Sequence, residues 1–318
     1  MDIAFCHHLS LSYNGGGEKW LINLSKELVK RGHSISIHCL PFTLKDKKCI
    51  SNTQLGSIPY TEKLFHNIHA DVSYVTYNPL SFLNFHIHGK KIAGFHTQTY
   101  EQKTFNHQYG FLPSIAKLAN DIFGSQDIKR FNAIHRLTPN TYTSPQISTY
   151  IIPNYVDSTI YKPSKKPEEF TVTYASRKVW QKGYDIYRLA KQALKSKVNF
   201  QESGSIPERD MPHFLSQGHV TIAPSRVDTF GLSLVESLMC GTPVITTSIL
   251  PHKRLNAKLF YADTPLTITN QILKLKTLFE TDTKTYNALC ATCRSSVMQY
   301  DKLQIVNQLE SMFKEVAS

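Results

Sequence analysis

Near the N-terminus, the pattern of hydrophobic and polar residues changes twice within forty positions. Residues 3–6 form a short apolar run that is typical of a buried strand. Apolar residues then recur at helical spacing over 18–31, and Gly32 predicts the end of that helix. Residues 34–40 alternate as a strand does. A strand, a glycine-rich loop, a helix and a second strand form a βαβ unit, which predicts a parallel sheet.

The same alternation of strand-like and helix-like segments returns in the second half of the chain. Further strands are expected at 72–76 and 91–95, followed by an irregular stretch as far as Tyr150. The second series of predicted elements comprises a strand at 170–174, helices at 184–194 and 211–217, a strand at 198–202, a strand, helix and strand within 220–248, and an amphipathic helix at 304–316.

A chain of 318 residues is long enough for two domains of about 150 residues each. The predicted fold class is α/β, with two Rossmann-like doubly wound parallel-sheet domains facing a cleft. The expected organisation is an N-terminal domain over 1–155, a linker rich in Pro and Lys over 156–169, and a C-terminal domain over 170–300. The helix within 301–318 is expected to cross back to the N-terminal domain.

The net charge of +12 is shared evenly, because residues 1–155 and 156–318 each carry an excess of six basic residues. This distribution excludes a basic tail, and the positive field attracts anions such as nucleotides, phosphorylated sugars or acidic lipid head groups. Nucleic acid is disfavoured as a partner, because aromatic residues are not interleaved with the basic ones. With no secretion signal and no run of about 18 apolar residues, we expect a cytoplasmic protein, and peripheral contact with an anionic membrane stays open.

In parallel sheets, ligands bind beyond the carboxyl ends of the strands, where the N-termini of helices point at the ligand. In the first domain, Gly16, Gly17 and His96 follow predicted strands. In the second, Arg177 with Lys182 and the segment 226–232 do so. Each has a simpler explanation, since glycines make tight turns, exposed Arg and Lys are often solvated, and a histidine can belong to the core. Together they indicate a site for a charged diphosphate and a polyhydroxylated ligand.

Two acidic residues, Asp228 and Glu236, lie on either side of a Phe-Gly pair at 230–231. Ser233 and Glu236 match a capping box, so Glu236 could simply cap a helix. A helix that begins near Gly231 instead places Glu236 in its second turn, on the side of the predicted cleft.

These segments, in this order, resemble the GT-B fold retaining glycosyltransferases of family 4, the glycosyl transferases group 1 type. The matching segments are Asn14–Glu18 with 21–33, Pro153–Asp157 against PNGVD, Arg177–Gly183 against R-x4-KG, and Pro224–Val244 against the EX7E segment PSxxExFGxxxxEAxxxGxPV. The chain differs in having Asp228 for the first Glu, Tyr155 and Ser176 for glycines, and no GGxxE stretch after Ser248.

The resemblance implies a role for each matching residue. Arg177 and Lys182 would hold the donor diphosphate, together with the helix N-terminus at Phe230, Gly231 and Leu232. Glu236 would bind ribose hydroxyls, Asp228 the hydroxyls of the sugar, and His96 the sugar or acceptor near the reacting centre. Gly16 and Gly17 would allow the backbone to approach the donor phosphates or the acceptor.

The resulting hypothesis is a retaining hexosyltransferase that moves a sugar from a nucleotide-diphosphate sugar to a hydroxyl of a glycan, a lipid or a protein-linked acceptor. No cofactor or metal is expected, because two cations neutralise the diphosphate and His86-x-His88 reads as one face of a strand. The alternatives are a nucleotide-sugar epimerase or hydrolase of the same fold, and a basic non-catalytic binding module on that scaffold. The sequence leaves the oligomeric state and the identity of base, sugar and acceptor open.

Overall fold

The computed structural model describes the chain except for residues 14–15, 42–54, 77–83, 97–127, 140–145 and 205. The chain divides into two compact units. Unit 1 comprises Met1–Ile152 and Val306–Ser318, and unit 2 comprises Pro153–Ile305. The segment 156–169, which the sequence suggested as a linker, is counted within unit 2. Lys166 ties this segment down, because its ammonium group donates to the carbonyls of Ser216 and Gly218 and to the hydroxyl of Thr242.

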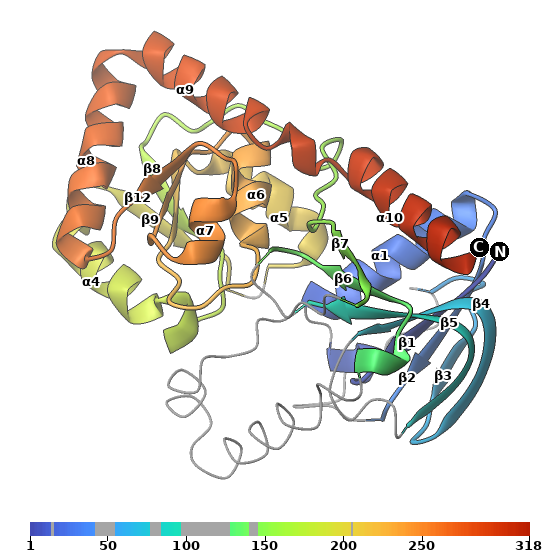
Figure 1. The fold of residues 1–318 in the computed structure, drawn as a ribbon. Coiled ribbons are helices and arrows are strands. Elements are labelled where there is room, and N and C mark those ends of the chain that lie inside the picture. The colour runs from blue at the N-terminus through green and yellow to red at the C-terminus, as the bar shows by residue number, and fades with distance from the viewer. Residues whose placement is uncertain (14–15, 42–54, 77–83, 97–127, 140–145, 205) are drawn as a thin grey trace. The chain divides into compact units, whose positions relative to one another are not determined.

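Unit 1 is built on a parallel seven-stranded sheet with the order β3-β2-β1-β4-β5-β6-β7 (Figure 1). Its elements are β1 (Asp2–His7), η1 (Leu11–Tyr13), α1 (Gly16–Lys30), β2 (Ser34–Cys39), β3 (Tyr60–Glu62), β4 (His66–Thr76), β5 (Phe85–Phe95), η4 (Ile128–Arg130), β6 (Ala133–Arg136) and β7 (Ser148–Ile151).

Helix α1 covers one face of this sheet through the predicted apolar stripe, in which Trp20, Leu21, Leu24 and Leu28 are all buried. Helix α10 (Lys302–Ala317) lies beside α1 in unit 1, where Glu310 accepts hydrogen bonds from Arg31 and His33. Phe313 of α10 packs edge-on against Phe5 of β1. The amphipathic C-terminal helix predicted from sequence therefore completes the core of unit 1.

Unit 2 contains a parallel five-stranded sheet with the order β12-β11-β10-β8-β9. Its elements are β8 (Thr171–Tyr174), η5 (Trp180–Lys182), α4 (Tyr184–Leu194), β9 (Asn199–Glu202), η6 (Glu208–Asp210), α5 (Met211–Gln217), β10 (Val220–Ala223), α6 (Leu232–Met239), β11 (Val244–Thr246), α7 (Leu250–Arg254), β12 (Leu259–Tyr261), α8 (Pro265–Thr281), α9 (Thr283–Ser295) and η7 (Met298–Tyr300).

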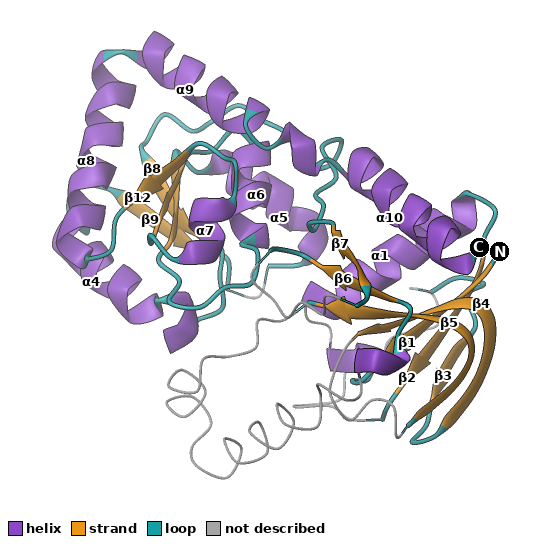
Figure 2. Cartoon of the chain, in the orientation of Figure 1, coloured by secondary structure: helices purple, strands orange, loops and turns teal. Residues whose placement is uncertain are grey.

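Helices cover both faces of the five-stranded sheet (Figure 2). Tyr187 and Leu194 of α4 and Ile268 and Ile272 of α8 are buried in one core with Val172 of β8. On the other face, Leu234 and Leu238 of α6 are fully buried. Every pair of described strands in both units is parallel, which confirms the predicted fold class of two doubly wound α/β layers.

The stretch expected to be irregular before Tyr150 contains strand β6 and most of strand β7. The pattern failed here because β6 buries two polar residues, His135 and Arg136. Strands β4 and β5 also begin earlier than predicted. Their first halves carry exposed histidines, and the pairing shifts register between His69 and Val72.

Candidate functional site

In unit 2, strands β8 and β10 lie side by side, while the chain leaves β8 toward β9 on one side and β10 toward β11 on the other. This is the topological switch point of the sheet, where ligands bind in open α/β folds. The loops that follow these two strands are residues 175–183 and 224–231. They contain all the residues that the sequence assigned to the donor in this half except Leu232 and Glu236, which lie on the helix that follows.

The loop after β8 is fixed at both ends by one side chain. The hydroxyl of Tyr174 lies 2.9 Å from the carbonyl oxygen of Arg177 and 3.3 Å from that of Lys182. Gly183 then crosses Pro224 so closely that a Cβ at position 183 would lie 1.9 Å from the Pro224 carbonyl oxygen. Only glycine fits there, at a φ of 65°. This crossing brings Lys182 to the loop that carries Asp228.

Lys182 and Asp228 form an ion pair, with 2.8 Å between Nζ and Oδ2. The other carboxylate oxygen, Oδ1, accepts the backbone N–H of Thr229 at 2.9 Å. Burial raises the pKa of Asp228, but the Lys182 charge and the nearby His252 outweigh it and hold that pKa well below its usual range. Asp228 is therefore ionised at neutral pH, and its side chain is 13% exposed.

His252 is the third member of this cluster and is fully buried on α7. Its Nε2 atom lies 3.5 Å from Oδ2 of Asp228, and its Nδ1 atom lies 2.8 Å from the hydroxyl oxygen of Thr246. Sequence reasoning missed His252 because a single histidine in a segment without a recognised motif carries no signal. The one available indication was its position after the fourth predicted strand of this half.

Helix α6 begins at Leu232, with Gly231 as N-cap in the left-handed conformation at a φ of 89°. Leu234 and Val235 are the first residues to donate into the helix, both to the Gly231 carbonyl. Among the residues that the structure describes, no side chain caps this end. The N–H groups of Leu232 and Ser233 precede the first intrahelical bond, so this terminus suits an anion.

Glu236 lies in the second turn of α6, and the capping box with Ser233 does not form. The carboxylate of Glu236 lies near the hydroxyl of Tyr161. Burial, followed by the charge of Glu236, raises the pKa of Tyr161 well above its usual range. The structure thus places a hydroxyl near Glu236 that the sequence did not predict.

The remaining donor candidates in unit 2 differ in how they are held. The guanidinium of Arg177 is exposed, and no described residue pairs with it. Phe230 is buried and packs edge-on against Tyr300, so only its backbone can face a ligand. By contrast, the guanidinium of Arg226 has structural partners. It donates to both carboxylate oxygens of Asp185 at 2.6 Å and lies over the Trp180 ring.

In unit 1, the switch point lies between β1 and β4, and His7 bridges their carboxyl ends. His7 Nδ1 lies 2.6 Å from the hydroxyl oxygen of Thr76, and Nε2 lies 2.8 Å from a carboxylate oxygen of Glu18. Gly16 and Gly17 form the first turn of α1, with no described atom within 4 Å of an added Cβ. The sequence placed these glycines correctly at a strand end but did not identify His7 or Glu18.

His96 follows β5 and is half-buried against Trp20, with ring centroids 4.3 Å apart. Its Nε2 lies 2.8 Å from the hydroxyl of Tyr74, which also contacts His135 Nδ1 at 2.5 Å. His135 must donate through Nε2 to the carbonyl of Ile152, and burial lowers the pKa of His135 to about 4. His135 Nδ1 therefore accepts a hydrogen bond from the hydroxyl of Tyr74.

It follows that the Tyr74 oxygen accepts from His96 Nε2, so the hydrogen-bond chain fixes the tautomer of His96. Burial lowers the pKa of His96 well below its usual range, so the ring is neutral. Its Nδ1 has no hydrogen-bond partner among the described residues and is an acceptor. His96 is therefore prepared to accept a hydrogen bond from a hydroxyl.

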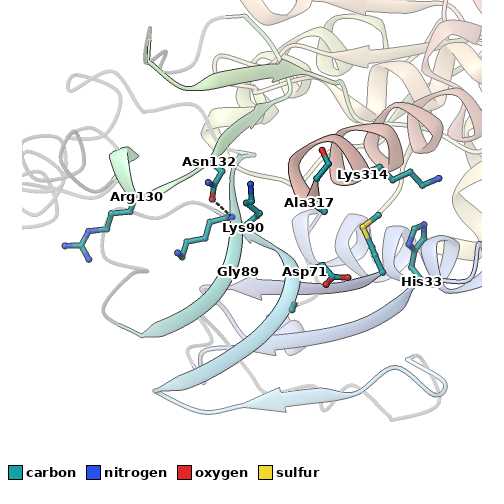
Figure 3. Close-up of a pocket in the computed structure, with 12 residues that line it drawn as sticks. His33, Asp71, Gly89, Lys90, Arg130, Asn132, Lys314 and Ala317 are labelled. Atoms are coloured by element: carbon teal, nitrogen blue, oxygen red, sulfur yellow. Dashed lines mark hydrogen bonds between the residues drawn. The ribbon is translucent and has the colours of Figure 1, made fainter.

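A hollow in unit 1 lies at the opposite ends of the strands, where Met1 and Asn132 precede β1 and β6 (Figure 3). Its lining includes Lys90, Arg130 and Lys314. Figure 3 shows that the head groups of Arg130 and Lys314 point away from each other. These charges do not converge, so the hollow is not the candidate site.

In the described part of the chain, no helix has both the length and the apolar composition that crossing a membrane requires. Nor do three His, Cys, Asp or Glu side chains gather there in a way that could hold a metal ion.

Comparisons with known proteins show which proteins this chain resembles. Residues 182–260 match the family model described as glycosyl transferases group 1. One relative is a component of the human phosphatidylinositol N-acetylglucosaminyltransferase, which is 22% identical over 74% of this chain and 59% of its own length. The chain thus spans about 59% of this curated relative.

Solved structures resemble the whole fold. Sucrose-phosphate synthase from Thermosynechococcus elongatus has a TM-score of 0.72 and 13% identity, covering 99% of both chains. Anabaena Alr3699/HepE in complex with UDP and glucose also has a TM-score of 0.72, with 16% identity and 99% of both chains covered. The chain therefore has the GT-B fold, and its residues 182–260 are similar to the group 1 glycosyltransferases.

Proposed function

We propose that this chain transfers a sugar from a nucleotide-diphosphate sugar to a hydroxyl acceptor, with retention of anomeric configuration and without a metal. One observation carries the proposal. Lys182, Asp228 and the uncapped N-terminus of α6 lie on the two loops at the switch point of the five-stranded sheet, within the segment that matches the family.

The donor roles follow from charge and accessibility. Arg177 and Lys182 bind the diphosphate, and the N–H groups at Gly231 and Leu232 complete its cradle. These groups also neutralise the charge that grows on the phosphate as the sugar leaves. Glu236 accepts hydrogen bonds from the ribose hydroxyls. In this structure the hydroxyl of Tyr161 lies near the same carboxylate. Asp228 accepts from hydroxyls of the transferred sugar.

The acceptor roles fall to unit 1. The neutral His96 receives a hydrogen bond at Nδ1 from a hydroxyl of the sugar or acceptor, and Gly16 and Gly17 leave the first turn of α1 open to the ligand. In the reaction, the bond between the anomeric carbon and the phosphate oxygen breaks. The acceptor oxygen attacks on the same face, and the departing phosphate oxygen takes the acceptor proton.

Same-face attack is proposed because both acidic residues of the site, Asp228 and Glu236, are assigned to hydroxyls of the donor, which leaves neither as the covalent nucleophile. Metal independence is proposed because the cations of Arg177 and Lys182 supply the charge that a divalent ion would supply. If both proposals hold, EDTA leaves turnover unchanged and the product keeps the anomeric configuration of the donor.

The complexes of Anabaena Alr3699/HepE contain UDP, glucose or UDP-glucose, which makes UDP-sugars the first donors to test. The name of the human relative describes transfer of N-acetylglucosamine to phosphatidylinositol, so lipid acceptors belong in the panel beside glycans and proteins. We also propose that the protein is cytoplasmic and that its basic surface contacts anionic membranes peripherally, which binding to anionic and neutral vesicles tests directly.

The experiment is a thermal-shift panel of nucleotide sugars, followed by product analysis with each acceptor class. A bound donor should raise the melting temperature, because it binds only the folded state. Transfer to an acceptor supports the proposal. Free sugar or an epimerised nucleotide sugar, produced equally with and without acceptor, would replace it with the hydrolase or epimerase alternative.

A further inference from the structure

His252 is held by two elements that leave one of its ring nitrogens without a partner. The Thr246 hydroxyl donates to the carbonyl of Ala223 at 2.7 Å, so it can only accept from His252 Nδ1. The second neighbour of Nδ1 is the carbonyl oxygen of Thr247 at 3.3 Å, which also only accepts. Nδ1 therefore carries a proton.

The other nitrogen, Nε2, is buried and makes no hydrogen bond among the described residues. It faces Oδ2 of Asp228 at 3.5 Å, and it would lie 3.4 Å from a Cβ built on Gly231, the N-cap of α6. A bare lone pair facing a carboxylate is repulsive, whereas a protonated Nε2 would attract it. His252 thus sits behind Asp228, at the edge of the uncapped helix terminus.

Lys182 Nζ is the other nitrogen near the same carboxylate oxygen, and the side chains of Lys182 and His252 differ in exposure. The Lys182 side chain is 20% exposed and flexible, while His252 is fully buried on a short helix. The proposed function needs Lys182 at the diphosphate. Moving it there would leave a buried carboxylate without its nearest cation, and removing one partner of such a pair is costly.

We propose that His252 is a positioning residue that keeps Asp228 ionised and in place when Lys182 leaves it for the donor diphosphate. This inference rests on the proposed function. Oδ2 of Asp228 has two nitrogen neighbours so that one can depart, and His252 is the fixed one. Without His252, Lys182 stays on Asp228 and diphosphate binding weakens.

The test is a double-mutant cycle on the full chain. The ligand is a nucleoside diphosphate without the sugar that is to be transferred, so that contacts of Asp228 with that sugar do not contribute to the measured affinity. The best binder among UDP, GDP and ADP is measured by calorimetry on wild type, His252→Asn, Asp228→Asn and the double variant. Asparagine keeps a donor near the position of Nδ1 for Thr246 but removes Nε2.

We expect His252→Asn to weaken nucleoside diphosphate binding about tenfold or more in the wild-type background, because Lys182 remains bound to Asp228. In the Asp228→Asn background the same change should leave the affinity for the nucleoside diphosphate unaltered, since position 228 no longer carries a carboxylate that needs a partner. His252→Gln, which keeps a donor near Nε2, should recover most of the affinity. The exposed His213 on α5 provides the matched control, and His213→Asn should bind as wild type does.

Equal loss in both backgrounds would mean that His252 acts through packing alone, and no loss in wild type would mean that Lys182 needs no substitute. Either result overturns this inference and leaves the glycosyltransferase proposal standing. A wild-type chain that binds none of the three diphosphates overturns both.

Discussion

Lys182 and Asp228 hold each other through a 2.8 Å ion pair, although the sequence motif assigns them to different parts of the donor. The pair explains how a buried carboxylate stays ionised before a ligand arrives. It also means that donor binding has to exchange one strong contact for another.

Lys182 should be needed for turnover more than for folding. Lys182→Met removes one of two cations from the leaving diphosphate, so we expect kcat/KM to fall about 100-fold or more. Steady-state kinetics with saturating acceptor measures this. Because His252 still faces Asp228, the melting temperature should stay close to that of the wild type while turnover is largely lost. Wild-type kinetics from Lys182→Met would remove this residue from the site.

Arg177 and Arg226 make a matched pair of arginines on the two loops at the switch point. Arg177→Ala should leave the free energy of unfolding within about 0.5 kcal/mol of wild type, because no described residue pairs with its guanidinium. It should nonetheless weaken nucleoside diphosphate binding. Arg226→Ala should do the reverse, since it breaks a bidentate pair with Asp185 and contact with Trp180. Urea unfolding and calorimetry on both variants test the contrast.

Gly183 should tolerate no side chain. Gly183→Ala should cost about 2 kcal/mol or more, because it adds a clash with Pro224 to a left-handed conformation. Gly204→Ala is the control, with a φ of 50° but no closer described atom than 4.0 Å, and should cost about 1 kcal/mol. Equal losses in urea unfolding would mean that the close crossing at Pro224 does not matter.

Tyr74 should act through His96 rather than through the donor. Tyr74→Phe removes the hydroxyl that fixes the tautomer of His96, so kcat should fall while nucleoside diphosphate affinity stays within about twofold. Single-turnover kinetics and calorimetry separate these quantities. Loss of diphosphate affinity with unchanged kcat would contradict the role of this chain of hydrogen bonds.

Glu310 should give unit 1 a stability that depends on pH. Lys314 and Arg31 lower the pKa of Glu310 to about 2 against burial, with a further contribution from His33. A carboxyl with a lowered folded pKa stabilises fully above its unfolded value of 4.5 and loses this contribution as pH falls toward 2. Glu310→Gln should therefore cost about 1–2 kcal/mol at pH 7 and clearly less at pH 3.

Urea unfolding at the two pH values measures this difference. Among the described residues, Glu280 pairs only with Lys276 one turn away, and its side chain is half exposed, so Glu280→Gln should change the free energy of unfolding little at either pH. A pH-independent cost for Glu310→Gln would show that the carboxylate charge is not what stabilises α10 against α1.

The sequence predicted the elements whose patterns are regular. Helix α4 has the predicted bounds, and the stripe from Trp20 to Leu28 packs as expected, because each buries one continuous apolar face. Strand β6 was missed because His135 and Arg136 are buried through hydrogen bonds rather than through apolar character.

The site shows the same division. Spacing and residue type pointed to Lys182 and Asp228, which the fold brings into contact, but could not show that they would pair with each other. His252 and Tyr161 depend on contacts between segments distant in sequence, with no motif to mark them. Arg177 shows the converse, since its exposure without a partner is visible only in the structure.

The most direct test of the central claim is a crystal structure of the full chain with the nucleotide sugar that binds best. We predict that Lys182 Nζ will lie on a phosphate oxygen at the N-terminus of α6, with Asp228 on the sugar and His252 still beside it. A nucleotide sugar bound away from this switch point, with Lys182 unchanged on Asp228, would contradict the account.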